Sequence, residues 1–392
     1  MAGDASTETA VDRGTRTARF GWFDGSLVAL AVASVCVTLA SALVQVSFGT
    51  YSMSIPEAWR ALFDPAILLD PRRLLYFFFG EWVMRLLTGY GGEVDALLDG
   101  LAVGTTVVWT LRLPRVLVGA LVGASLAVSG AIFQAVTRNE LASPYILGVS
   151  AGAGLGALVA LVLFTALEAV LPLVAAGGGA FAFLLVYVIA WKNGTNPVRL
   201  VLAGVIVSTV FHSLQTGLFF LASDIGVVQQ ALSWTTGSLT GVGWEQFRTA
   251  LPWVVVALAL ALVGARQLNV LLLGERTAAA LGMSVERTRF ALAAVAVLAA
   301  SAAVAVAGIV SFVGLIVPHV VRTIVGSDYK RLVVGCVFAG PALLTAADVG
   351  ARLFFEVAFN SPVQIPVGIV TGLVGGPYFL YLMRTRDQLG EL

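Results

Sequence analysis

The sequence contains few charged residues and few residues that form covalent or metal-bound cross-links. Only 11% of its 392 residues are Asp, Glu, Lys or Arg, against about a quarter in soluble globular proteins. Two cysteines and two histidines occur in the whole chain, which excludes a disulfide framework or a Cys/His metal site. Hydrophobic residues make up 59% and the mean hydropathy is +0.94. This balance excludes a soluble domain and predicts a polytopic membrane protein.

Motifs for ATP binding and for common catalytic sites are also missing. The phosphate-binding pattern G-x-x-x-x-G-K-[ST] occurs nowhere in the chain. The apolar runs contain no H-E-x-x-H motif, no paired carboxylates and no Ser–His constellation. We therefore expect no catalytic residue, no bound metal, no cofactor and no nucleic-acid partner.

Apolar runs near the roughly 20 residues needed to cross a bilayer recur along the chain. The run at 290–326 is too long for one span, because a helix of that length measures roughly 55 Å against a hydrocarbon core of about 30 Å. We divide it near Gly308 to Gly314, which predicts an all-α fold with ten transmembrane helices. The runs lie at 27–48, 113–136, 145–167, 171–191, 199–222, 249–265, 290–326, 331–355 and 363–383.

The distribution of basic residues orients these spans. Ten spans with both termini in the cytoplasm place most Lys and Arg inside and mostly acids outside, as the positive-inside rule requires. The predicted organisation is a polar cytoplasmic tail at 1–26, a transmembrane domain at 27–383 and a cytoplasmic tail at 384–392, in the cell membrane. The basic residues assigned to the cytoplasm are Arg138, Lys192, Arg199, Arg266, Arg276, Arg287, Arg289, Arg322, Lys330, Arg331, Arg384 and Arg386.

The long extracytoplasmic segment at 49–106 contains RLLYFFFGEWVMRLL at 73–87, which is too short and too charged to span. We predict an amphipathic helix that lies at the outer membrane interface, with packing on the protein as the alternative. The stretch 227–243 is likewise too polar for a full span and predicts a short half-helix near the outer face.

A charged segment at 266–289 separates two apolar runs on the cytoplasmic side. Gly282 divides it into two short predicted helices, with Gly274 before the first and Ser284 as a cap for the second. An interfacial hairpin that only joins two spans is the simpler alternative. Its helical structure and charge favour a surface that contacts a partner.

Two arginines at the outer end of the second span oppose the positive-inside trend. Arg112 and Arg115 lie within one helical turn, and snorkelling to lipid phosphates is the simplest explanation for a single arginine in that position. Asp348 precedes Arg352 by four residues, the favourable order for an ion pair on one helix, and we prefer this pairing to proton relay. Both His212 and His319 are expected to be packed helix residues rather than metal ligands.

Glycines recur every fourth residue in two neighbouring runs, a spacing that clears a groove for close helix contact. They are Gly119 and Gly123, followed by Gly148, Gly152 and Gly156. Packing within the chain and a dimer contact are equally compatible with this pattern.

Several motifs together resemble the FecCD family of ABC importer permeases, which carry vitamin B12, haem and ferric siderophores. The resemblance covers nearly the whole chain from Leu111 onward. It rests on LRLPRVLVGALVGASLAVSGAIFQAVTRNELASPYILGVSAGAGLGA at 111–157, LVLAGVIVS at 200–208, the 268–290 segment, GIVSFVGLIVPHVVR at 308–322 and IPVGIVTGLVGGPYFLYLM at 365–383.

The resemblance implies a type II ABC importer permease fold: a homodimer in the lipid bilayer, with two cytoplasmic ATP-binding subunits below and an extracytoplasmic substrate-binding protein above. Arg112, Arg115 and Arg352 match positions that contact the binding protein. The ATPase-coupling positions are Gly274, Glu275, Ala279, Leu281 and Gly282, within the coupling segment 266–289. We expect the loop from Lys192 to Arg199, which includes Asn196, Pro197 and Val198, to close the inner end of the path.

Three features depart from the family pattern. The segment 49–106 is longer than the family's outer loop. Gln364 stands where the family usually has a glutamate, and Glu140 replaces the usual proline, which predicts a looser turn.

An ion-coupled secondary transporter is the main alternative of another class. Such proteins place acids or broken-helix ion sites near the midplane, whereas Asp348 is almost alone among acids in these spans. Cobalamin is our leading substrate, with ferric siderophore or haem as alternatives. No residue of this chain selects among them, because most of the selection belongs to the binding protein.

Overall fold

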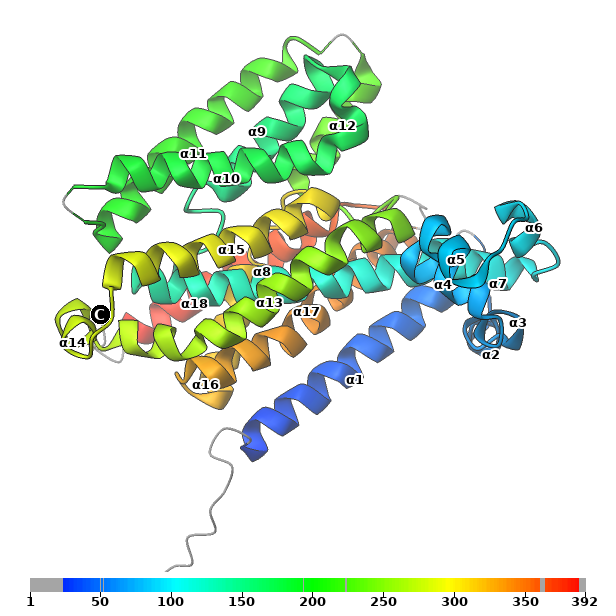
Figure 1. The fold of residues 1–392 in the computed structure, drawn as a ribbon, viewed down its shortest axis with the longest axis horizontal. Helices are drawn as coiled ribbons and strands as arrows, with labels where there is room; N and C mark the ends of the chain where they lie inside the picture. Colours follow the sequence, from blue (N-terminus) through cyan, green and yellow to red (C-terminus); the bar gives the residue numbers. More distant parts are fainter. Residues whose placement is uncertain are drawn as a thin grey trace, which may run out of the picture.

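Helix α8 (Leu113–Thr137) lies at the centre of the molecule, between α13 (Trp244–Leu272), α15 (Val285–Ala307) and α17 (Tyr329–Phe359) (Figure 1). The computed structural model describes residues 24–49, 51, 53–192, 194–222, 224–359 and 364–387. In the most apolar part of α8, 83% of residues are buried, against 17% in the peripheral α1 (Gly25–Ser47). Small residues make this possible, because they let neighbouring helices approach α8 from several sides.

Seven helices of the described chain are long and apolar enough to cross a membrane. These are α1, α8 with its extension back to Val103, α10 (Leu171–Ala190), α11 (Pro197–Phe219), α13, α15 and α17. Three shorter apolar stretches lie where the other spans were predicted: α9 (Val149–Val162), α16 (Val313–Val325) and the part of α18 (Val367–Asp387) from Val367 to Tyr381. The structure confirms the division of the 290–326 run, since α15 ends at Ala307 and α16 begins at Val313. The number of spans, ten, stays a prediction.

Helices α9, α10 and α11 pack together with the short α12 (Ile225–Thr236), the predicted half-helix, on one side of the α8 bundle (Figure 1). Glycines make the close contacts within this layer. A Cβ at Gly152 would meet the carbonyl O of Gly178 on α10, and a Cβ at Gly156 would lie 2.7 Å from the carbonyl O of Val174. Gly123 of α8 faces Gly340 of α17 in the same way. These predicted grooves are therefore filled within the chain.

The segment between α1 and α8 folds into a lobe of short helices at one end of the molecule (Figure 1). They are α2 (Ile55–Leu62), α3 (Pro65–Leu68), α4 (Pro71–Phe79), α5 (Glu81–Thr88), α6 (Val94–Leu98) and α7 (Val103–Val107). A π-helical stretch, η1 (Val108–Arg112), joins α7 to α8 without a break. We call residues 55–107 the lobe.

The predicted helix at 73–87 is interrupted at Gly80, whose φ of +88° ends α4 and starts α5. The lobe packs on the protein through Phe77, which contacts the rings of Trp109 and Trp244. Arg248 donates hydrogen bonds to the carbonyl oxygens of Tyr76 and Phe77, each at 3.1 Å. The segment therefore packs on the protein, and its location at the membrane interface stays a prediction.

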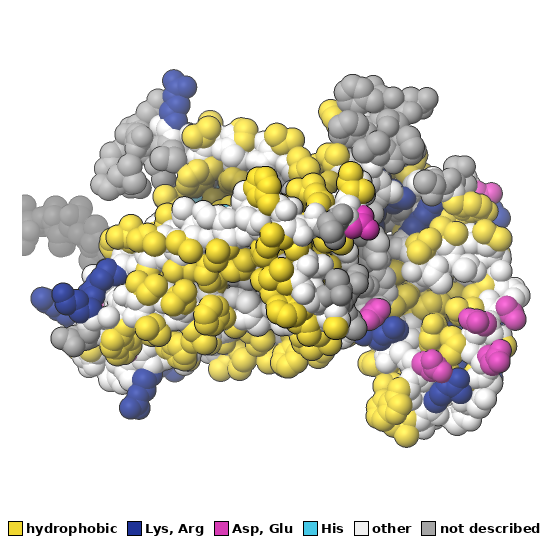
Figure 2. Space-filling view, turned by 90° about the horizontal axis from the view of Figure 1, so that it is seen from above, with side chains coloured by type: hydrophobic (Ala, Val, Ile, Leu, Met, Phe, Trp, Pro, Cys, Tyr) yellow, Lys and Arg dark blue, Asp and Glu magenta, His cyan; other side chains and the backbone are white. Residues whose placement is uncertain are grey.

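Charged side chains gather at the two ends of the molecule, and hydrophobic side chains cover the surface between them (Figure 2). Acidic groups belong mainly to the lobe, where Asp70 pairs with Arg72. Burial acts to raise the pKa of the Asp70 carboxyl, but hydrogen bonds from Arg72 outweigh it and the pKa is lowered. The opposite end carries the short helix α14 (Glu275–Ala280). A bilayer around the apolar middle would leave both ends in water.

Candidate functional site

A buried polar cluster lies where α8 and α17 meet below the lobe. Arg115 of α8 pairs with Asp348 of α17 through Nε and Nη2, each 2.9 Å from a carboxylate oxygen. Its Nη1 donates to the Oε1 of Gln364 at 2.9 Å, and Gln45 of α1 donates to Asp348. The Asp348 side chain is 1% exposed and that of Arg115 is 10% exposed. This bidentate geometry neutralises two charges that would otherwise be costly to bury.

The prediction that Asp348 pairs with Arg352 on the same helix was wrong. The structure gives Asp348 a different partner, because α17 turns this carboxylate toward α8, where Arg115 projects. Arg352 instead donates to the carbonyl O of Gln45 at 3.4 Å. Gln45 and Gln364 were also missed as members of the cluster. A glutamine inside an otherwise apolar run was the signal available for Gln45.

Arg112 is 4% exposed and donates to the carbonyl oxygens of Val46, in the last turn of α1, and of Tyr51, which follows this helix. Its guanidinium lies close enough to that of Arg352 for their charges to repel. Arg352 is partly exposed. Of the three arginines predicted to contact a binding protein, only Arg352 is therefore accessible in this conformation.

The coupling segment forms one short helix at the opposite end of the molecule. Gly274, with φ +95°, precedes α14, and Gly282, with φ +81°, follows it. Ala279 and Leu281 are exposed, and Leu281 presents 64% of its surface. The second predicted short helix was wrong, because residues from Val285 onward form the first turns of α15, and Ser284 makes no side-chain cap.

A network of ion pairs joins α14 to the rest of this end. Glu275 accepts from Arg289 at 2.7 Å and lies 3.3 Å from Arg138, which follows α8. Arg289 also pairs with Glu286 at 3.0 Å and donates to the carbonyl O of Thr195 at 2.7 Å. Sequence reasoning assigned Arg289 only to the basic loop. Its position one residue before an apolar run was the signal that it is buried.

The predicted inner-gate residues start α11. The Asn196 side chain caps the helix by accepting from the backbone N–H of Val198 at 2.8 Å, and Pro197 occupies the first turn. Val198 is 74% exposed. The preceding residue, Thr195, is buried and belongs to the Arg289 network.

Glu140, which replaces the family's proline, lies 3.4 Å from the Nη1 of Arg322 on α16. The same carboxylate lies 3.9 Å from His319. The turn after α8 is held by Asn139, whose side chain accepts from the N–H of Leu141. Glu140 thus adds an ionic contact between this turn and α16.

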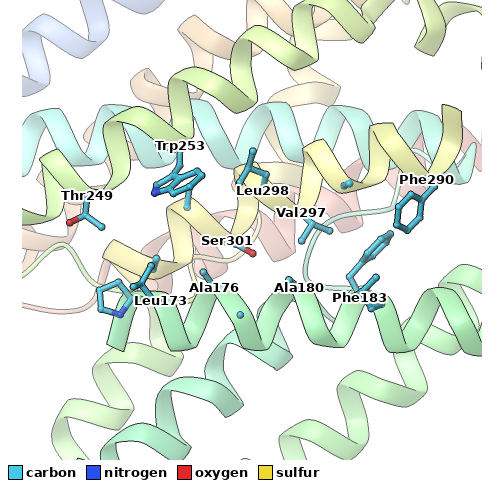
Figure 3. A pocket seen from close by; sticks show the side chains of 16 residues that line it. Leu173, Ala176, Ala180, Phe183, Thr249, Trp253, Phe290, Val297, Leu298 and Ser301 are labelled. Carbon is cyan, nitrogen blue, oxygen red and sulfur yellow. The ribbon is translucent and has the colours of Figure 1, made fainter. Parts of the chain in front are cut away.

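A cavity of about 440 Å³ lies between α10, α13 and α15 (Figure 3). Of its lining residues, only Thr249 and Ser301 carry polar side chains, and Trp253, Phe183 and Phe290 provide aromatic surface. A charged solute needs polar groups to replace its hydration, so this cavity suits an aliphatic group better. A second cavity of about 360 Å³ near α12 has polar lining residues, among them Gln230, Glu245 and Gln246.

Comparison with known proteins identifies the family. The model of the FecCD transport family matches residues 35–385, which is most of the chain. The chain belongs to the FecCD transport family. This FecCD protein is 44% identical over 282 residues to the cobalamin import system permease protein BtuC of Halobacterium salinarum, covering 72% of this chain and 74% of the relative.

Other FecCD relatives are named for iron. Over 325 residues the chain is 37% identical to the iron(3+)-hydroxamate import system permease protein FhuG of Bacillus subtilis, covering 81% of this chain and 90% of the relative. It is 40% identical over 308 residues to the ferric enterobactin transport system permease protein FepG of Escherichia coli, covering 78% of this chain and 91% of the relative.

A solved structure described as an inward-facing metal-chelate type ABC transporter has the same fold. The TM-score is 0.72 at 24% sequence identity, and the match covers 91% of this chain and 99% of that one. The all-α, multi-pass FecCD fold expected from the sequence is confirmed.

Proposed function

We propose that this chain is the transmembrane permease subunit of an ABC importer that carries a metal chelate across the cell membrane. Two copies form the path, two ATP-binding subunits contact its cytoplasmic face, and a substrate-binding protein docks on the outer face. Both termini lie in the cytoplasm. Residues 1–23 and 388–392 of the tails lie outside the described residues.

Helix α14 is the observation that carries this proposal. It stands between two long apolar helices and is fixed to the membrane domain through Glu275, and the leucines at its two ends, Leu273 and Leu281, are exposed. Exposed apolar side chains grouped around a short, rigidly attached helix suit a contact with another protein. A secondary transporter needs no such surface, and Asp348, the main candidate for its ion site, is already neutralised by Arg115.

Cobalamin is our proposed substrate, and ferric siderophore and haem are the alternatives. The cobalamin relative is 44% identical, and an iron(3+)-citrate permease of B. subtilis is 42% identical over a similar length. Reconstitution with the cognate partners and uptake of labelled cobalamin or a labelled ferric chelate decides between them. We expect ATP-dependent uptake of cobalamin alone. Uptake of only the iron chelate would instead make a ferric chelate the substrate.

Arg352, with Arg112 and Arg115 beneath it, is our proposal for the outer docking contact. Replacing Arg352 by Glu should lower stimulation of the ATPase by the binding protein about tenfold or more, because the partners proposed for Arg352 are acidic residues of the binding protein and like charges across an interface cost several kcal/mol. Arg60→Glu, the same reversal on an exposed lobe residue, is the matched control. Equal stimulation of both variants would exclude Arg352 from the contact.

A further inference from the structure

Arg289 is 2% exposed although it lies in a charged segment at the end of the molecule. A buried guanidinium is tolerated only when carboxylate and carbonyl oxygens replace the water around it. Its partners come from three elements: Glu275 from α14, Glu286 from the first turn of α15, and Thr195 from the connection between α10 and α11. One side chain thus joins α14 and α15 to the connection before α11, where Thr195 lies 94 positions away in the sequence.

The two ends of the guanidinium fork serve different elements. Nη2 donates to the Oε1 of Glu275 at 2.7 Å. Nη1 donates to Glu286 at 3.0 Å and to the Thr195 carbonyl O at 2.7 Å. The Thr195 hydroxyl closes the network by donating to the Oε2 of Glu286 at 2.7 Å. Because the fork is planar and rigid, a shift of Glu275 changes the orientation available to the other bonds.

We propose that Arg289 is a positioning residue that transmits movement of α14 to the connection at 191–196, which leads into α11. This inference rests on the proposed function, in which the ATPase moves α14. The Glu275 side chain is 43% exposed, so an ATPase subunit can reach it, whereas Thr195 is buried. The network therefore runs from an accessible carboxylate to a buried threonine beside the proposed inner gate.

An anchor for α15 alone would have a simpler contact pattern. The Arg289–Glu286 pair lies within one helix at i,i+3 and would fix the side chain without α14. The additional bond to Thr195 connects α15 to a segment 94 positions away, which has no covalent reason to move with it. Such a network transmits a displacement when it has two arrangements and both sites bias the equilibrium between them.

The coupling ratio, which is the number of ATP molecules hydrolysed per molecule transported, tests this role in the complete transporter. Glu275→Gln removes the charge that α14 contributes, and Thr195→Val removes the hydroxyl. Arg289→Gln removes the hub, and Arg384→Gln, at an exposed arginine in the last turn of α18, is its matched control. In proteoliposomes, the network variants should hydrolyse about tenfold more ATP per molecule transported, within the usual range of coupling energies. The control should keep the wild-type ratio.

A distance measurement separates transmission from general loss of activity. A spin label at Val198→Cys in each subunit, in a Cys36→Ser background, reports the separation of the two α11 starts. This separation should change on ATP binding in the parent and stay at its nucleotide-free value in Glu275→Gln. Normal switching and a normal coupling ratio in Glu275→Gln would overturn the inference. A parent chain that assembles with no ATPase would instead overturn the proposed function.

Discussion

Replacing Gly130 by valine should prevent stable packing of α8 against α16. A Cβ at this position would overlap the carbonyl O of Gly314, which is backbone and has no rotamer with which to move away. Over-packed cores lose about 1–3 kcal/mol, and a clash with backbone belongs at or above the upper end of that range. We expect little folded Gly130→Val protein in detergent and a clearly lower Tm for what remains.

Gly350 provides the matched control for this substitution. It is an exposed glycine within α17, and a Cβ there meets nothing within 4 Å. Gly350→Ala should be neutral or stabilising by less than about 1 kcal/mol, because alanine is the better helix former. Size-exclusion profiles recorded after stepwise heating compare the two variants. A Gly130→Val chain as stable as Gly350→Ala would show that α8 and α16 do not pack as described.

Replacing Asp348 by alanine should be at least as severe. Arg115 would keep its charge in a buried site with only Gln364 as a partner, and breaking a buried ion pair in this way costs about 3–5 kcal/mol. The exposed pair of Glu81 and Arg85 in the lobe is the comparison, because its side chains are 51% and 36% exposed. Glu81→Ala should cost under about 1 kcal/mol.

A double variant tests whether the Arg115–Asp348 pair has a role beyond folding. Arg115→Met with Asp348→Leu removes both charges and keeps similar volume, so stability should return to near that of the parent. If the pair only stabilises the α8–α17 contact, transport should recover with stability. A single Asp348→Ala variant with unchanged Tm would contradict the buried pair itself.

Much of the fold follows from the sequence, because the bilayer fixes the length of an apolar helix. Each predicted run contains an apolar helix, and the 290–326 run turns where its length required. Helix ends were less accurate. Helix α13 continues to Leu272, past the predicted end at 265, because Arg266, Gln267 and Asn269 are polar but compatible with a helix that extends beyond the hydrocarbon.

The polar contacts were less predictable, since they depend on which helix faces which. The i,i+4 spacing of Asp348 and Arg352 is a local rule, whereas the observed partner, Arg115, lies 233 positions away. The burial of Arg289 has the same origin: its partners become visible only once α14, α15 and the connection before α11 are placed together. The position of the coupling segment could be predicted from the sequence, whereas its attachment through Glu275 and Arg289 required the structure.

The native mass of the complex, extracted gently from its own membranes with every co-purifying chain identified, tests the proposed importer most directly. We expect two copies of this chain with two ATP-binding subunits. A lone chain or a simple homodimer, reproducibly without any ATPase under conditions that preserve a known ABC transporter, would contradict the importer function and favour secondary transport.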